Sequence, residues 1–136
     1  MNYFLDTSAC VAILRHKPES VRIKAERTIR QGSTLLISSI VLQELWYGVF
    51  KSSRVDESVR QLQAFLAWGV EVLDFGPEDA RFSGRIRAEL EARGSRIGAY
   101  DTLIGGQCLR QGFTLVTNNL SEFSRIPGLA CVDWSK

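Results

Sequence analysis

The chain has 136 residues, of which 45% are hydrophobic and 24% charged, with a formal net charge of +2 at pH 7. This composition is ordinary for a folded chain and excludes intrinsic disorder. No apolar run reaches the ~20 residues of a membrane-spanning helix, and the first residues lack the pattern of a secretory signal. We therefore expect one domain over residues 1–136, located in the cytoplasm, with no membrane partner.

Strand-like and helix-like segments alternate along the chain. Short apolar runs predict strands at residues 2–6, 34–38, 70–75, 113–117 and 129–134. Amphipathic or capped segments predict helices at 9–15, 19–32, 40–51, 56–69, 78–94 and 99–112, with a short helical turn before the last strand. Helices between successive strands favour parallel pairing through right-handed crossovers. The expected fold is a single-domain, doubly wound α/β/α sandwich with a central, mainly parallel sheet.

Local signals support these elements. Ser38 or Ser39 can cap the helix that follows the second strand, and Pro77 suits the first turn of another helix. Gly105 and Gly106 fall inside a predicted helix, where they favour close packing against a neighbouring helix. We expect the carboxyl ends of the strands to form the reactive edge of the sheet.

Most acidic residues have a cation three or four positions away on the same helix, which indicates a solvated, ion-paired surface. Glu122, with Arg125 one turn later, fits this group, although its place beside the polar segment 117–119 also makes it the local alternative acid for a site there. Asp79 follows Pro77 in a first helical turn, where the helix dipole accounts for an acid.

Asp6, Glu44 and Asp101 have no such partner and stand among apolar residues. A lone acid on a buried face is unfavourable by several kcal/mol unless it is paired, protonated or bound to a metal. If the three meet at the reactive edge, a divalent cation would hold them together, and oxygen ligands suit Mg²⁺ or Mn²⁺. The simpler alternative explains each acid separately: Asp6 by a turn, Glu44 by a distant arginine and Asp101 by a helix N-terminus.

Other chemistries fit less well. The three cysteines are odd in number and far apart in apolar surroundings, which favours buried side chains: Cys10, Cys108 and Cys131. His16 is the only histidine and stands between two cations, which disfavours a nucleophile–histidine pair. Asp74 ends the third strand as in a phospho-accepting receiver module, but such a module needs paired acids after the first strand and a lysine after the last.

The chain carries four distinctive segments in order: FLDTS, SSIVLQELWYGV, RGSRIGAYDTLIGGQ and LVTNNLSEFSRIPGLACVDW. Together they resemble the PIN-domain family, and within it the VapC-type toxins of bacterial toxin–antitoxin pairs. The resemblance implies a Mg²⁺-dependent endoribonuclease that cuts a structured RNA, such as a tRNA or a ribosomal RNA loop, by metal-activated water. It also implies inhibition by a cognate VapB-type antitoxin and a homodimer within a larger complex.

The resemblance also assigns roles by position. Asp6, Glu44 and Asp101 match the family's acidic triad, with Asp6 and Asp101 as the metal contacts. Asn119 occupies a fourth catalytic position, where many relatives carry an aspartate, and is expected to position a water without adding charge. The hydroxyls of Thr7 and Thr117 match family positions that support these acids or their waters.

Two further groups bear on partners. The densest basic stretch is expected to contact RNA phosphates in part, with helix-surface pairing as the alternative: Arg81, Arg85, Arg87, Arg93 and Arg96. An aromatic cluster is expected to be mostly core, with part available to a second subunit or the antitoxin: Trp46, Tyr47, Phe50, Phe65 and Trp68. The alternative function is a non-catalytic RNA- or protein-binding module of the same fold.

Overall fold

The computed structural model describes residues 1–136 and has one five-stranded sheet at its centre, in the order β3-β2-β1-β4-β5. Every neighbouring pair is parallel. The strands are β1 (Asn2–Leu5), β2 (Thr34–Ser38), β3 (Val70–Leu73), β4 (Thr114–Val116) and β5 (Ala130–Val132). The expected α/β/α architecture is confirmed, and the sheet is parallel throughout.

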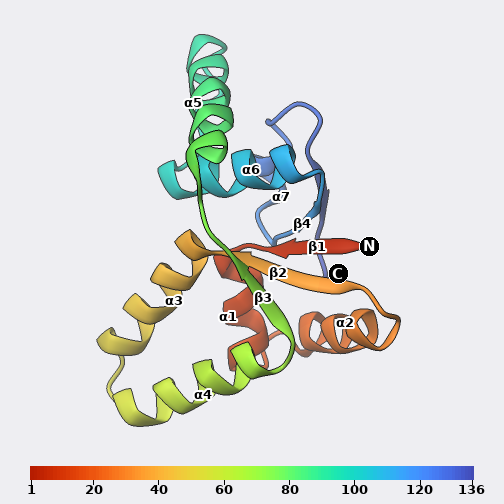
Figure 1. Cartoon of the computed structure of the whole chain (residues 1–136), viewed down its shortest axis with the longest axis vertical. Coiled ribbons are helices and arrows are strands. Elements are labelled where there is room, and N and C mark those ends of the chain that lie inside the picture. The colour runs from red at the N-terminus through yellow and green to blue at the C-terminus, as the bar shows by residue number, and fades with distance from the viewer.

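Seven helices surround the sheet: α1 (Thr7–Arg15), α2 (Glu19–Arg30), α3 (Ser39–Lys51), α4 (Val55–Ala67), α5 (Pro77–Ala92), α6 (Ala99–Gln111) and α7 (Leu120–Phe123). In the edge-on view of Figure 1, α1 to α4 lie on one side of the sheet and α6 and α7 on the other. Helix α5 projects away from the sheet and packs mainly against α6. None of the seven is both long and apolar enough to span a bilayer.

The core follows from the apolar pattern of the sequence. The central strands are buried almost completely, and 27 buried hydrophobic residues form one contiguous cluster through both layers. Burial of this apolar surface is the main stabilising contribution to such a fold. Cys10 and Cys108 are part of the cluster, and Cys131 packs against it, in agreement with the expectation of apolar roles for the cysteines.

Helices α5 and α6 are held together by close backbone contact. A Cβ atom added at Gly106 would lie 2.7 Å from Cα of Ser83 in α5, and one at Gly105 would lie 2.5 Å from the side chain of Ile126. The two glycines therefore permit close packing, as predicted. This contact matters for the site because α6 also carries Asp101 in its first turn.

An ion pair also joins the same two helices. Asp79 is 1% exposed, and its Oδ1 accepts from Nε of Arg110 in α6 at 2.5 Å, while its Oδ2 accepts from the backbone N–H of Gly76 at 2.8 Å. The sequence explanation for Asp79, a helix dipole alone, was therefore incomplete. The arginine partner lies 31 residues away in sequence, beyond any local pairing rule.

The strand order reverses direction at β1. From β1 the chain adds β2 and β3 on one side, then crosses to add β4 and β5 on the other. In parallel α/β sheets the crevice beside such a switch point, at the carboxyl ends of the strands, is the usual location of a functional site. Here the carboxyl ends of β1 and β4 lead into Asp6 and into residues 117–119.

Candidate active site

A cleft of about 730 Å³ opens at this switch point and collects all four site residues expected from the sequence. Only two of its lining residues are hydrophobic. The polar residues of the lining include Asp6, Thr7, Ser8, Glu44, Asp101, Asn118 and Asn119, with the cations Arg15 and Lys17. Side chains from the β1–α1 junction, α1, α3, α6 and the segment after β4 thus line one cleft.

Asp6 sits at the junction of β1 and α1. It is the N-cap of α1, where its Oδ1 accepts from the backbone N–H of Ala9 at 2.8 Å and from the Ser8 hydroxyl at 2.7 Å. The side chain is 4% exposed, and burial raises its pKa above the usual range. The charge of Glu44 adds to this rise, while hydrogen bonds from Thr117, Ser8 and Ala9 oppose it.

Glu44 reaches the cleft from the middle of α3. Its Oε1 accepts a 2.6 Å hydrogen bond from the hydroxyl of Thr7, the residue that follows Asp6. This contact fixes the orientation of the half-buried carboxylate across 37 positions of sequence. The resemblance implies a supporting role for Thr7, and this hydrogen bond to Glu44 is how it would support an acid.

Asp101 lies in the first turn of α6. Burial raises its pKa to about 6, and the charges of Asp6 and Glu122 contribute further to the rise. Asn119 opposes the shift, because its Nδ2 donates to Oδ2 of Asp101 at 3.4 Å. The carboxylates are therefore close enough to repel one another.

Glu122 belongs to this acidic group, although the sequence assigned it to a surface pair with Arg125. Its Oε1 accepts from the backbone N–H of Gly98 at 3.2 Å, and its Oε2 accepts from Nδ2 of Asn119. These bonds, with the Asn119 bond first, lower the pKa of Glu122. Arg125 forms no ion pair with it and donates instead to the backbone carbonyl of Arg96. The available signal was that Glu122 stands only three residues after Asn119.

The amide of Asn119 connects the two acids. Its nitrogen donates to both Asp101 and Glu122, and its backbone N–H donates to the Thr117 hydroxyl at 2.9 Å. A carboxylate at this position would have no proton to donate to either neighbour. Asn119 therefore holds the acids with a neutral donor, which is a more specific arrangement than the water-positioning role expected from the sequence.

None of these carboxylates forms an ion pair. The ion pairs of the chain involve other acids, mostly between residues three or four apart on one helix. Arg15 and Lys17 line the same cleft without approaching an acid within ion-pair distance. The cleft thus contains acids without an ion-pair partner and two unpaired cations that can bind an anion.

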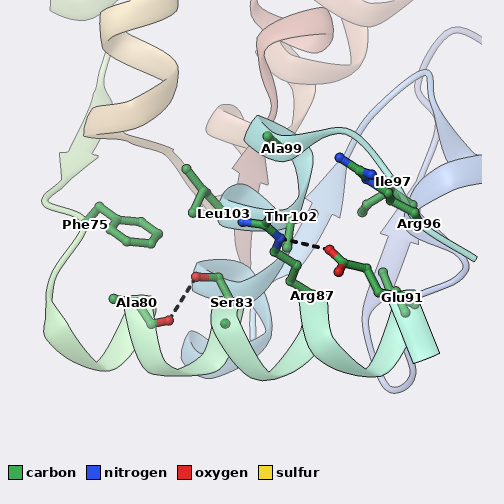
Figure 2. Close-up of a pocket in the computed structure, with 12 residues that line it drawn as sticks. Phe75, Ala80, Ser83, Arg87, Glu91, Arg96, Ile97, Ala99, Thr102 and Leu103 are labelled. Atoms are coloured by element: carbon green, nitrogen blue, oxygen red, sulfur yellow. Dashed lines mark hydrogen bonds and ion pairs between the residues drawn. The ribbon is translucent and has the colours of Figure 1, made fainter. Parts of the chain in front are cut away.

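A second cavity, of about 360 Å³, lies between α5 and α6 (Figure 2). Half of its lining is hydrophobic, and its one acid, Glu91, is held by Nε of Arg87 at 3.0 Å. It contains none of the acids of the polar cleft. Metal-dependent chemistry accordingly fits the cleft at the switch point and not this cavity.

An apolar groove of about 290 Å³ runs between α1, α3 and α4 and continues into the acidic cleft. The two hollows share Val11, Arg15 and Glu44. Further along the groove lie Leu14, Leu45 and Val49. The groove therefore opens into the cleft beside Glu44.

Comparison with known proteins identifies the family. The PIN domain profile matches residues 3–129. The chain is 40% identical to a protein of Salmonella typhimurium named tRNA(fMet)-specific endonuclease VapC, over 98% of each chain. It is 40% identical to ribonuclease VapC2 of Rickettsia felis over 100% of each chain.

The structural comparison agrees. The crystal structure of VapBC2 from Rickettsia felis bound to a promoter DNA fragment contains a chain that matches with a TM-score of 0.91 and 40% identity, covering 98% of this chain and 99% of that one. Sequence and fold therefore agree over nearly the full length. This chain belongs to the PIN-domain family and, within it, to the VapC ribonucleases.

Proposed function

We propose that this chain is a Mg²⁺-dependent endoribonuclease toxin that cuts a structured RNA and is inhibited by a cognate VapB-type antitoxin. The observation that carries the proposal is the cleft at the switch point, which Asp6, Glu44 and Asp101 line, with Glu122 beside Asp101 and none of the four in an ion pair. Uncompensated carboxylates in one place are unfavourable unless a cation joins them. Mn²⁺ is the second candidate for that cation.

The donor set fits such a metal. Carboxylate oxygens are the ligands that Mg²⁺ prefers, and it commonly uses one or two of them while it keeps several waters. No three acidic, histidine or cysteine side chains converge to form a cage made by protein alone. Asp6 and Asp101 would hold the ion, since the charge of Asp6 raises the pKa of Asp101 when no cation lies between them. When bound, the ion would supply an activated water and stabilise charge on the phosphoryl group.

The chain's own residues would do the remaining work. Glu44, whose carboxylate accepts from the Thr7 hydroxyl, would accept a proton from the attacking water. Asn119 would hold the carboxylates of Asp101 and Glu122 in fixed positions by donating to both. Arg15 and Lys17 would contact the phosphates of the strand being cut, because they line the cleft with free charge.

For the substrate, we propose a tRNA or a ribosomal RNA loop, with tRNA(fMet) as the first candidate. The support is the relative named for that activity, which is 40% identical over almost the whole chain. Mapping of new RNA 5′ ends in cells after brief induction would identify the target. Ends confined to messenger RNA would contradict this choice.

Two protein partners complete the proposal, in the cytoplasm. A VapB-type antitoxin would occupy the apolar groove between α1, α3 and α4 and so reach the acids, in keeping with the VapBC complex of the related structure. A second copy of the chain would cover exposed aromatic surface on α3, where Tyr47 is 59% and Phe50 66% exposed. Phe65 is buried and the two tryptophans are half-buried, so only this part of the aromatic cluster is available to a partner.

Cleavage assays test the activity. The wild-type chain and Asp101→Asn should be incubated with labelled tRNA in Mg²⁺ and in EDTA. We expect cleavage only by the wild type in Mg²⁺, with a loss of at least about 100-fold for the variant, in the range seen when a positioned catalytic group is removed. Equal cleavage in all four reactions would contradict a metal-dependent nuclease.

A matched control separates the site from general acidity. Asp56 is an exposed acid in the first turn of α4 and forms no ion pair. Asp56→Asn should cut at the wild-type rate. The alternative function, a non-catalytic binding module, requires that wild type and Asp101→Asn bind the tRNA equally and that neither cuts it.

A further inference from the structure

Five arginines between residues 81 and 96 divide into two groups in the structure. Three form ion pairs with a glutamate on the same helix, at distances of 2.7 to 3.1 Å: Arg81, Arg85 and Arg87. Arg93 and Arg96, which belong to the loop between α5 and α6, form none. In Figure 2 a dashed line joins Arg87 to Glu91, whereas no dashed line reaches Arg96, which is drawn on the same side of the cavity as Glu91.

Arg125 connects these two free arginines. The Nη2 of Arg93 donates to the backbone carbonyl of Arg125 at 3.2 Å, and the Nη1 of Arg125 donates to the backbone carbonyl of Arg96 at 2.9 Å. All three side chains are exposed. Because a guanidinium has five N–H donors, most of the donors in this arginine cluster remain available. Backbone carbonyls thus hold the guanidinium groups of Arg93 and Arg125 without neutralising them, and the second bond anchors the backbone of Arg96.

The arginine cluster lies beside the acidic cleft. Two residues after Arg96, the N–H of Gly98 donates to Glu122, and Gly98 is the N-cap of the helix that carries Asp101. On the partner segment of this contact, Arg125 follows Glu122 by three residues. The loop 93–98 therefore carries two cations, and the turn 122–125 a third, close to Glu122 and to the first turn of the helix that carries Asp101.

This arrangement suits an RNA strand. A strand entering a cleft lined by three carboxylates is repelled except where cations contact its phosphates, and Arg15 and Lys17 are the only cations that line the cleft itself. We infer that Arg93 and Arg96, positioned by Arg125, bind a backbone phosphate of the RNA next to the bond that is cut. The inference rests on the proposed ribonuclease function and adds to it a phosphate-binding site outside the cleft.

Salt dependence of RNA binding provides the test. Binding of a fluorescein-labelled tRNA would be measured in EDTA, so that no cleavage occurs, over a range of KCl concentrations. Each phosphate contact contributes roughly 0.7 to 0.9 to the slope of log Kd against log salt concentration. The double variant Arg93→Gln/Arg96→Gln should therefore lower that slope by about 0.7 to 0.9, the contribution of one phosphate, and weaken binding at low salt.

A double variant with the same change in charge provides the control. Arg81→Gln/Arg85→Gln removes two arginines that already have glutamate partners, and its slope should remain near that of the wild type. Arg93→Lys/Arg96→Lys keeps the charge and should restore most of the slope, which separates phosphate binding from a folding defect. In Mg²⁺, the Arg93→Gln/Arg96→Gln variant should show a raised KM for tRNA cleavage and a nearly unchanged kcat.

Equal slopes for the two glutamine double variants would overturn the inference while leaving the ribonuclease function intact. If the Arg93→Gln/Arg96→Gln variant bound tRNA normally but lost binding to a poly-glutamate peptide, the cluster would belong to an acidic protein segment, which also overturns it. A wild type that bound tRNA but never cut it in Mg²⁺ would contradict the proposed activity, and the slopes would still decide the role of the cluster.

Discussion

Asp101 shows how position alone changes the chemistry of a residue. Its pKa rises from 3.8 to about 6, first through burial and then through the charges of Asp6 and Glu122. A carboxyl with a higher pKa in the folded state binds its proton more tightly there than in the unfolded chain. The free energy of unfolding contributed by Asp101 therefore falls as pH rises from 3.8 to about 6.

Because this contribution falls with rising pH, it gives a stability prediction for the metal-free protein. In EDTA, the melting temperature of the wild type minus that of Asp101→Asn should decrease as pH rises through this window and then level off. Asparagine cannot ionise, so the difference isolates the titration of Asp101 and its effect on neighbouring acids. Thermal denaturation followed by circular dichroism would measure it, and a difference that stays constant with pH would show that Asp101 is not electrostatically strained.

The sequence could identify Asp6, Glu44 and Asp101 because the criterion was local. A helical acid without a cation one turn away needs another explanation, and all three of these acids line the cleft. The same criterion failed for Glu122, because it paired the glutamate with Arg125 by spacing. In the structure Arg125 bonds to a carbonyl 29 residues away, which no rule based on neighbours along a helix can detect.

At the scale of the elements, alternation of apolar runs and amphipathic segments was enough to predict every strand and helix. Their ends were less certain: the last strand, expected at 129–134, spans Ala130–Val132. The periodicity of a sequence reports which face of an element is buried, but not which element covers it. The strand order and the position of α5, which stands off the sheet against α6, therefore required the structure.

The contact between α5 and α6 sets the position of Asp101, and two glycines test it. In Gly106→Ala the new Cβ would lie 2.7 Å from Cα of Ser83 and 2.9 Å from its backbone nitrogen, so the helices must separate. We expect a lower melting temperature and reduced RNA cleavage, because α6 shifts with Asp101 in its first turn. Both follow from overpacking, which typically costs about 1–3 kcal/mol of unfolding free energy.

Gly84 provides the matched control within the same helix pair. It lies in the middle of α5, and a Cβ added there would meet no atom within 4 Å. Since alanine favours a helix over glycine by up to about 1 kcal/mol, Gly84→Ala should be as stable as the wild type or more so, with cleavage unchanged. Equal effects of the two substitutions would mean that α5–α6 contact does not position the site.

At the scale of the whole molecule, folding itself creates the electrostatic problem that a metal would relieve. Asp6, Glu44, Asp101 and Glu122 come from four different elements and are brought together only when the sheet and its helices assemble. In the unfolded chain they are far apart and repel one another little. A cation that binds the folded cleft should therefore stabilise the entire fold by mass action.

Titration with Mg²⁺ measures this coupling directly. Starting in EDTA, the melting temperature of the wild type should rise with Mg²⁺ concentration, following a stabilisation of RT ln(1 + [Mg²⁺]/Kd). Asp6→Asn/Asp101→Asn should lose most of this rise, and Asn is a suitable replacement because it can still cap α1 at position 6. Asp56→Asn, which changes an exposed acid, should keep it. KCl at matched ionic strength corrects for screening, and an equal rise in all three proteins after that correction would place the cation away from these carboxylates.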